Sequence, residues 1–455
     1  MLESIKTITK KIKRQSKASG VLQDSACLKT LKELLGGDLE FHGEDSSYAS
    51  HNFHAFAAKF PPQLPAAFIK ELTEPGDTVL DPMMGSGTTV LEAAIAGRKA
   101  TGYDIDPLAI LLCKVKTTKI KDIEKLKTFS AEIILRARKL AVSREAEIEI
   151  ESRFDKKTKE FLNYWFLAST QRELMALLMA FECILINETD AVKNFFQLAF
   201  SSIIVTKSGG VTLARDLAHG RPHKVEDKKP KDAIDQFRQR VQKNIKGIEI
   251  LKEKELGNVK IKEGDARCLK TQEGESVKLV VTSPPYANAI DYMRAHKYSL
   301  SWFGHPIGDL SQLRATYIGS ERINKEENKD TLPASAEAVV RSLKEEDRKQ
   351  SEVLKKYFLE MQKVFKEIYR VLKPDSAAVV VVGSSTMRGI DVKTHECLAD
   401  IAANLQKPFK VAGVVPRRLD RNKRMMPARF GGKSNSMIEQ RMHEEFVIGL
   451  YKPGA

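Results

Sequence analysis

Two aspartates and two glycines between residues 81 and 104 have the spacing of a nucleotide site. Asp81 ends a short apolar, β-branched run that we interpret as a buried strand, and Gly85 and Gly87 follow it. Glycines at this spacing permit a tight turn whose backbone approaches a ligand closely. A helix is expected over residues 90–96, followed by a second strand that ends at Asp104. A carboxylate at that distance suits the hydroxyls of a ribose.

The residues at and after the two glycines distinguish this motif from two other nucleotide-binding motifs. A phosphate-binding Walker loop requires Lys after its last glycine, but Thr88 follows Gly87. A dinucleotide fingerprint favours Gly or Ala at position 90, which is Val90 here. A turn without any ligand is the remaining alternative, and the aspartates at both strand ends argue against it.

A second stretch places polar and rigid groups at another strand end. Residues 278–282 form an apolar run that we interpret as a buried strand, and Ser283-Pro284-Pro285-Tyr286 follows directly. The two prolines lack backbone donors and fix φ, so the carbonyls of Ser283 and Pro284 can point outward. The carboxyl end of a strand is where open α/β sheets place their chemistry.

Together the two stretches resemble the S-adenosylmethionine-dependent amino-methyltransferases of DNA, which methylate cytosine N4 or adenine N6. Residues 81–89 are similar to the cofactor loop of that family, and residues 283–286 to its catalytic tetrapeptide. The resemblance extends over residues 51–115 and 255–300 and, more loosely, 350–455. Met83 stands where the family usually has Phe, which leaves the adenosine pocket apolar. The implied fold is an α/β, doubly wound, mostly parallel sheet of the class I methyltransferase (Rossmann-like) type, with a helical insertion.

The resemblance also implies the residues that bind S-adenosylmethionine. Lys59 and Phe60, in a Lys-Phe-Pro-Pro segment, are expected at the methionine end of the cofactor, although Phe60 could equally be a core residue. Asp265 is expected to accept from the adenine amino group, and Ala266 to donate its backbone amide. The full set of expected cofactor-binding residues is Lys59, Phe60, Asp81, Pro82, Met83, Gly85, Ser86, Gly87, Thr88, Thr89, Asp104, Ile105, Asp265 and Ala266.

The tetrapeptide supplies the expected catalytic residues Ser283, Pro284, Pro285 and Tyr286. The amino group of a base is a poor nucleophile because its lone pair is conjugated with the ring. If the Ser283 hydroxyl and the Pro284 carbonyl accept both amino hydrogens, the nitrogen becomes more tetrahedral and its lone pair is freed. Tyr286 is expected to stack on the base, which must be flipped out of the duplex.

The first residue of the tetrapeptide bears on which base is methylated. Within the resembled family, Ser-Pro-Pro-Tyr is mostly found in cytosine-N4 enzymes, whereas Asp or Asn usually leads in adenine-N6 enzymes. We therefore expect cytosine N4, with adenine N6 as the alternative. Methylation at cytosine C5 would require a nucleophilic Cys, and none of the five cysteines lies in a comparable motif.

Composition is consistent with a globular protein that binds a polyanion. The chain has 455 residues, of which 42% are hydrophobic and 30% charged, and its net charge is +15. The expected partner is DNA; a cognate restriction endonuclease is conceivable, and the oligomeric state is left open. The cysteines form no CxxC pair, and His51 and His54 lack a third ligand, so no metal site is expected. The longest apolar run, residues 377–382, is too short to cross a membrane, which favours a cytoplasmic protein.

The chain is expected to have three parts. Residues 1–50 form a basic N-terminal segment, residues 51–115 and 256–455 the catalytic domain, and residues 116–255 a helical insertion that could recognise DNA. The basic N-terminus could be a solvated tail or a nucleic-acid arm, and residues 213–224 an exposed connector or a DNA contact. A basic late loop is expected to bind DNA phosphates, with a solvated loop as the alternative; its residues are Arg417, Arg418, Arg421, Lys423, Arg424 and Arg429.

Two other functions remain open at this point. Similar Pro-Pro-Tyr corners occur in RNA and protein amino-methyltransferases, so an RNA substrate is one alternative. A nucleic-acid-binding module without catalytic activity is another, although intact Asp81, Asp104 and Ser283 argue against it.

Overall fold

The computed structural model describes residues 24–206, 210–215, 217, 222–287, 291–322, 331–419 and 444–454. Its central element is a seven-stranded sheet with the order β3-β2-β1-β4-β5-β9-β8. The strands are β1 (Thr78–Asp81), β2 (Lys99–Asp104), β3 (Val259–Glu263), β4 (Val277–Thr282), β5 (Leu372–Gly383), β8 (Lys410–Arg418) and β9 (Glu444–Lys452). The first five strands in this order are parallel, and β9 runs antiparallel to both of its neighbours. The predicted α/β class is confirmed, and β8 and β9 form an antiparallel pair at one edge of the sheet.

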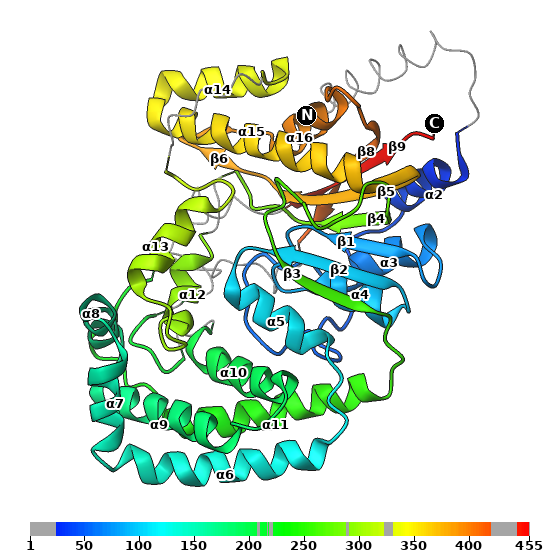
Figure 1. The fold of residues 1–455 in the computed structure, drawn as a ribbon. Coiled ribbons are helices and arrows are strands. Elements are labelled where there is room, and N and C mark those ends of the chain that lie inside the picture. Colours follow the sequence, from blue (N-terminus) through cyan, green and yellow to red (C-terminus); the bar gives the residue numbers. More distant parts are fainter. Residues whose placement is uncertain are drawn as a thin grey trace.

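Apolar side chains cover both faces of the sheet, as an internal parallel sheet requires. Residues 377–382 of β5 are all buried, with alternate side chains entering opposite cores. On one face lie α14 (Ala334–Glu346), α15 (Arg348–Val371) and α16 (Thr394–Ala403). On the other lie α2 (Ala26–Gly36), α3 (Gln63–Leu72), α4 (Thr88–Ile95) and α5 (Pro107–Thr117) (Figure 1). A small hairpin, β6 (Thr386–Met387) and β7 (Ile390–Asp391), follows β5.

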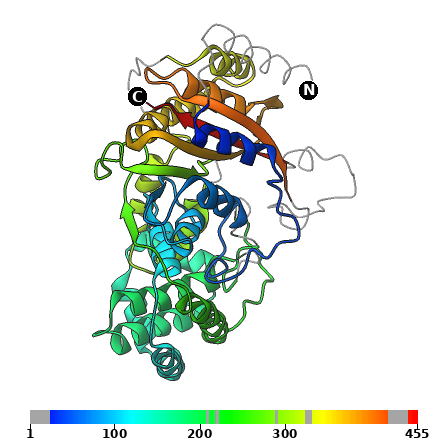
Figure 2. The same cartoon turned by 90° about the vertical axis from the view of Figure 1, so that its right-hand side faces the viewer.

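Helix α2 shows that the predicted boundary at residue 50 does not separate two folding units. Its apolar side chains Leu28, Leu31 and Leu35 are buried in the core beside β5, β8 and β9. Figure 2 shows this helix lying against the edge strands. Residues 24–50 therefore belong to the catalytic domain, whereas residues 1–23 lie outside the described part of the chain.

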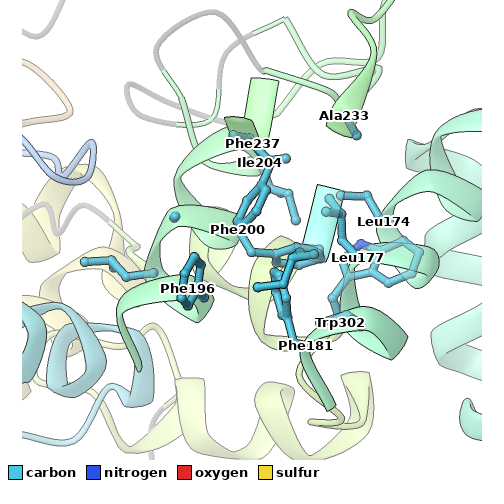
Figure 3. Close-up of a cluster of buried hydrophobic side chains, with 14 of the residues drawn as sticks. Leu174, Leu177, Phe181, Phe196, Phe200, Ile204, Ala233, Phe237 and Trp302 are labelled. Carbon is cyan, nitrogen blue, oxygen red and sulfur yellow. The ribbon is translucent and has the colours of Figure 1, made fainter. Parts of the chain in front are cut away.

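The helical insertion lies between β2 and β3 in the sequence and forms a separate helical layer that packs against α5 (Figure 1). It consists of α6 (Ile123–Ala141), α7 (Glu145–Arg153), α8 (Lys156–Trp165), α9 (Ala168–Ile184), α10 (Asp190–Ile204) and α11 (Ala233–Lys252). Aromatic side chains fill its core, among them Phe181, Phe196 and Phe237 (Figure 3). Trp302 and Leu112 also enter this core, so the insertion packs against the catalytic domain.

Two short helices complete the arrangement around the carboxyl ends of the strands. They are α12 (Met293–Leu300) and α13 (Ile307–Thr316). Tyr298 of α12 contacts the insertion through edge-on rings with Phe161 and Trp165 of α8. None of the helices in the described residues is long and apolar enough to span a membrane.

Candidate active site

A pocket lies where β1, β2, β3 and β4 end. The space between its lining atoms, including the part open to solvent, is about 870 Å³. The lining residues are Phe56, Ala58, Lys59, Phe60, Asp81, Pro82, Met83, Met84, Gly85, Ser86, Thr88, Asp104, Ile105, Asp106, Ala109, Gly264, Asp265, Ala266, Ser283, Pro285, Tyr292, Tyr317 and Ile318. The two sequence motifs therefore meet in one cavity.

The glycine turn after β1 is held by the aspartate at the end of β2. The backbone amide of Gly85 donates to Oδ2 of Asp104 at 2.8 Å, and the amide of Asp106 donates to Oδ1 at 2.9 Å. Gly85 has a φ of +45°, and a Cβ there would lie 3.0 Å from the Phe56 ring. Only glycine suits this position, because a side chain would be both strained and crowded.

The carboxylate of Asp104 retains acceptor capacity for a ligand. Each oxygen accepts one backbone amide, and a carboxylate oxygen can accept two hydrogen bonds. Burial, followed by repulsion from Asp106, raises the pKa of Asp104 to about 6. A group with these properties gains most from a ligand that donates two hydroxyl hydrogens to it.

Asp106 connects the pocket to α12 and α13. Its Oδ2 accepts from the Tyr317 hydroxyl at 2.9 Å and lies 2.6 Å from Nδ1 of His296, which is buried. Burial tends to raise the pKa of Asp106, but the charge and hydrogen bond of His296 lower it more, so the pKa of Asp106 lies below its ordinary value. His296 is thus a buried contact between α12 and the segment that follows β2.

Aromatic rings form the wall above the glycine turn. Phe56 and Tyr292 stack with ring centroids 5.1 Å apart, and both line the pocket. Lys59 also lines it and donates from Nζ to the backbone oxygen of His51 at 2.7 Å. Phe60 is only 6% exposed; it lines the pocket and also belongs to the hydrophobic core.

His51 and His54 are not arranged as a metal site. Nε2 of His51 lies 2.7 Å from Oε1 of Glu92, and Nε2 of His54 lies 2.8 Å from Oγ of Ser201. No group of three potential metal ligands occurs in the described residues. Their contacts instead attach residues 51–54 to α4 and α10.

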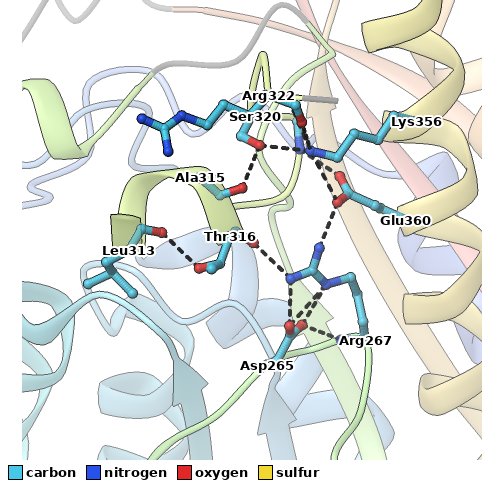
Figure 4. Close-up of polar contacts among 10 residues, drawn as sticks. Asp265, Arg267, Leu313, Ala315, Thr316, Ser320, Arg322, Lys356 and Glu360 are labelled. Atoms are coloured by element: carbon cyan, nitrogen blue, oxygen red, sulfur yellow. Dashed lines mark hydrogen bonds and ion pairs between the residues drawn. The ribbon is translucent and has the colours of Figure 1, made fainter. Parts of the chain in front are cut away.

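Asp265 and Ala266 line the pocket at the end of β3, where the family resemblance places the adenine. Arg267 holds the Asp265 carboxylate, because its Nε lies 2.9 Å from Oδ1 and its Nη2 lies 2.6 Å from Oδ2 (Figure 4). No local pattern singles out Arg267, because a Gly-Asp turn is common and the neighbouring residues carry no motif.

Only part of the catalytic tetrapeptide faces the cavity. Ser283 and Pro285 are lining residues, whereas Pro284 and Tyr286 are buried and outside the lining set. The Tyr286 hydroxyl donates to Oε1 of Glu445 at 2.9 Å, and a Cβ on Gly383 would collide with its ring. In this conformation the ring supports the tetrapeptide from within the protein, which corrects our expectation that it is available for stacking on a base.

The predicted phosphate-binding residues fall into three groups. Arg417 is 3% exposed, pairs with Oε2 of Glu445 and donates to the backbone oxygen of Leu39, so the expected DNA contact is corrected to a structural role. Arg418 is exposed at the end of β8. The other four residues, Arg421, Lys423, Arg424 and Arg429, lie outside the described residues.

The structure brings together most of the predicted cofactor residues. Gly87 and Thr89 are the exceptions, because they are buried or packed behind the turn, with Gly87 against Cys113. Sequence reasoning missed several lining residues, including Phe56, Asp106, Tyr292, Tyr317 and Ile318. A place for Asp106 in the pocket could have been predicted because it lies two residues after Asp104, just beyond the end of the same strand. Tyr317 and Ile318 lie in no recognisable sequence motif.

The residues of the pocket fit S-adenosylmethionine. Asp104 has free acceptor capacity for ribose hydroxyls, Met83, Ile105 and Ile318 offer apolar walls for an adenine, and Gly85 allows close backbone approach. When bound, this cofactor supplies an electrophilic methyl group on a sulfonium. The sheet order, the acidic end of β2 and the Ser-Pro-Pro-Tyr corner at β4 define a class I methyltransferase.

Comparison with known proteins assigns the chain to a particular family within this class. A family model for N6 and N4 methyltransferases, described as DNA methylase, matches residues 6–114 and 277–439. This is more than half of the chain, so the protein belongs to the DNA methylase family, its cofactor is S-adenosylmethionine, and it methylates amino groups in DNA. The RNA and non-enzymatic alternatives are thereby set aside.

Relatives extend the similarity over most of the chain. A Type II methyltransferase, M.MvaI of Kocuria varians, is 25% identical over 428 residues, covering 88% of this chain and 92% of the relative. Another, M.BsoBI of Geobacillus stearothermophilus, is 22% identical over 420 residues, covering 82% of each. A solved SAM-dependent methyltransferase from Methanosarcina mazei is 11% identical, with a TM-score of 0.31, and the match covers 85% of this chain and 98% of that one.

Proposed function

We propose that the protein transfers a methyl group from S-adenosylmethionine to the N4 amino group of cytosine in DNA. The observation that carries this proposal is the position of Ser283. Its side chain lines the same cavity as Asp104, and no hydrogen bond occupies its hydroxyl within the described residues. The resemblance of Ser-Pro-Pro-Tyr to the tetrapeptide of cytosine-N4 enzymes adds to it.

The chemistry required of the protein is positioning and hydrogen bonding. Ser283, which lines the pocket, accepts one hydrogen of the cytosine amino group. The family resemblance assigns the other hydrogen to the backbone carbonyl of Pro284, which must turn toward the pocket because Pro284 does not line it in this conformation. Both bonds draw the nitrogen toward tetrahedral geometry, so its lone pair becomes available for in-line attack on a methyl group. The proton released from the amino nitrogen leaves through solvent, and no covalent intermediate with the protein forms.

Tyr286 supports this arrangement through the fold. Its hydroxyl is bonded to Glu445, and its ring packs on Gly383 at the end of β5. We propose that these contacts fix the tetrapeptide relative to the sheet, and that the rings of Phe56 and Tyr292 offer the apolar surface next to the reacting groups. The base reaches this pocket only after it is flipped out of the duplex.

The names of the relatives suggest the biological setting. M.MvaI and M.BsoBI are Type II methyltransferases, so we propose that this protein also methylates a defined DNA sequence and has a cognate restriction endonuclease. The net charge of +15 supports binding to a polyanion of this kind.

The test is nucleoside mass spectrometry of DNA treated with the purified protein and S-adenosylmethionine. N4-methylcytosine is the expected product, and a Ser283→Ala variant serves as the control for contaminating activity. The alternative is N6-methyladenine, because adenine N1 lies beside its amino group as cytosine N3 does and a Ser hydroxyl could bond to either. Finding N6-methyladenine without N4-methylcytosine would overturn the proposed base and leave the family assignment intact.

A further inference from the structure

The last residue of α13 and the segment after it contact both sides of the pocket. We define this segment, residues 316–322, as the strap. It supplies Tyr317 and Ile318 to the pocket lining, and Ile318 is 7% exposed. Tyr317 donates to Asp106 just beyond β2, whereas the backbone oxygen of Thr316 accepts from Arg267 just beyond β3. The strap therefore spans the ends of two neighbouring strands.

Arg267 joins the strap to the pocket wall. Its guanidinium donates from Nη2 to the Thr316 oxygen at 2.7 Å and from Nη1 to Oε1 of Glu360 at 2.6 Å (Figure 4). The same guanidinium binds both oxygens of Asp265, at 2.9 Å from Nε and 2.6 Å from Nη2. One side chain thus contacts the adenine-side carboxylate, the strap and α15.

Glu360 on α15 holds the strap from the other side. Its Oε2 accepts from the backbone amide of Gly319 at 2.9 Å, while its Oε1 accepts from Arg267. One turn earlier on the same helix, Lys356 donates from Nζ to the backbone oxygens of Ser320, at 3.2 Å, and Arg322, at 2.7 Å (Figure 4). These bonds fix the backbone of the strap over four residues.

The Arg267–Glu360 pair is shielded from water, which makes its loss consequential. The Glu360 side chain is 9% exposed and that of Arg267 is 20% exposed. Removing Glu360 leaves Arg267 with Asp265 as its remaining acidic partner, and removing Arg267 takes the nearest cation from the buried Glu360 carboxylate. Oδ1 of Asp265 also accepts the backbone amide of Arg267 at 2.8 Å, so the orientation of this carboxylate depends on one residue.

We propose that Arg267 is a positioning residue for the cofactor: it orients Asp265 toward the adenine and, through Glu360, holds the strap closed beside it. Adenine recognition and cofactor retention are then coupled through a single guanidinium. The proposal rests on the cofactor of the family and is independent of which DNA base is methylated.

The first test measures how fast the full-length protein releases S-adenosylhomocysteine. Radiolabelled ligand is chased with unlabelled ligand for the wild type and for Glu360→Gln, which is isosteric and keeps an acceptor for Gly319. We expect the dissociation rate to rise about tenfold, equivalent to about 1.4 kcal/mol. An unchanged rate would overturn the role of the pair in retention.

The chain offers a matched control on the same helix. Arg370 pairs with Glu367 at 2.8 Å and donates to the backbone oxygen of Leu269, so it also ties the loop after β3 to α15. Neither Arg370 nor Glu367 lines the pocket or bonds to the strap. Glu367→Gln should leave the dissociation rate at the wild-type value, and a rise equal to that of Glu360→Gln would overturn the proposal.

The second test separates positioning of Asp265 from a general structural role. Calorimetry compares the affinities for S-adenosylhomocysteine and S-inosylhomocysteine, in which a carbonyl oxygen replaces the adenine amino group. The wild type should prefer the amino form, and Arg267→Met should reduce this preference about tenfold, with Arg267→Lys in between. A preference that is unchanged in Arg267→Met, while overall affinity falls, would overturn the positioning role.

Discussion

The hydroxyl of Thr282 donates to Oδ1 of Asp81 at 2.7 Å, although the two residues are 201 positions apart in the sequence. Thr282 ends β4 and Asp81 ends the adjacent strand β1. The bond therefore joins the start of the cofactor loop to the start of the catalytic tetrapeptide. Asp81 is 2% exposed, and burial raises its pKa to about 7, against the opposing effect of the Thr282 donor.

Thr282→Val should destabilise the protein at pH 8, where Asp81 is ionised. The substitution keeps the shape of the side chain but removes a donor from a buried carboxylate, which costs about 1–3 kcal/mol. Urea denaturation at pH 8 and pH 5 measures the effect, and the loss should be smaller at pH 5 because Asp81 is then protonated. Thr282→Ser retains the hydroxyl and is the control. Equal stabilities of Thr282→Val and the wild type at pH 8 would contradict the role of this bond.

The motifs and their order could be predicted because they depend on local chemistry. Asp81, Gly85 and Gly87 sit on one strand–turn–helix unit, and their roles follow from backbone geometry at that unit.

The inward orientation of Arg417 could not be predicted, because it depends on a partner far away. Arginines in a basic, late stretch are usually solvated, and nothing in the sequence marks Glu445 as the carboxylate that removes this one from water. The same holds for Tyr317, which reaches Asp106 across 211 residues. Long-range pairs of this kind are set by the sheet order rather than by any local pattern.

Binding of S-adenosylmethionine should weaken as the pH falls from 7 to 5. The pKa of Asp104 is raised to about 6 in the free protein, so the carboxylate becomes protonated in this interval. Ribose hydroxyls donate to the ionised form, so cofactor binding lowers this pKa and releases protons near pH 6. Calorimetry in two buffers of different ionisation enthalpy measures the release. Asp104→Asn should abolish it, and Asp104→Ala should weaken binding by about 1–3 kcal/mol.

The charge of Asp104 should favour cofactor binding but destabilise the fold of the free protein. A carboxyl whose folded pKa lies above its unfolded value stabilises the fold at low pH, and that contribution is lost as the pH rises through about 6. Asp104→Asn should therefore stabilise the free protein above pH 6, as measured by thermal unfolding without cofactor. A variant that is less stable than the wild type at pH 8 would indicate that the Gly85 amide bond outweighs the charge.

Arg417 and the basic residues after it should behave differently in DNA binding. Arg417→Met leaves Glu445 buried without its partner, which typically costs 3–5 kcal/mol of stability. Because Arg417 does not face solvent, the salt dependence of DNA binding by the folded variant should stay as in the wild type. A shallower dependence of DNA affinity on salt concentration would indicate that Arg417 does contact DNA phosphates.

A variant in which Arg421, Lys423 and Arg424 are all replaced should be compared with Arg417→Met in the same DNA-binding measurement. If these residues contact phosphates, the slope of log K against log salt should become shallower by about two to three units, since each contact contributes about 0.9. Filter binding or fluorescence anisotropy over a range of salt concentrations gives the slope. An unaltered slope would place the DNA path elsewhere, such as along the helical insertion.

Ser283 and Tyr286 should affect turnover through different routes. Ser283→Ala removes an acceptor for the amino group and should lower kcat strongly, while the affinity for S-adenosylmethionine stays close to that of the wild type. Tyr286→Phe keeps the ring on Gly383 and removes only the bond to Glu445, so its effect on kcat should be smaller than that of Tyr286→Ala. Single-turnover kinetics and cofactor calorimetry on the same preparations separate chemistry from binding. Equal turnover of Ser283→Ala and the wild type would remove Ser283 from the reaction and, with it, the main support for cytosine N4.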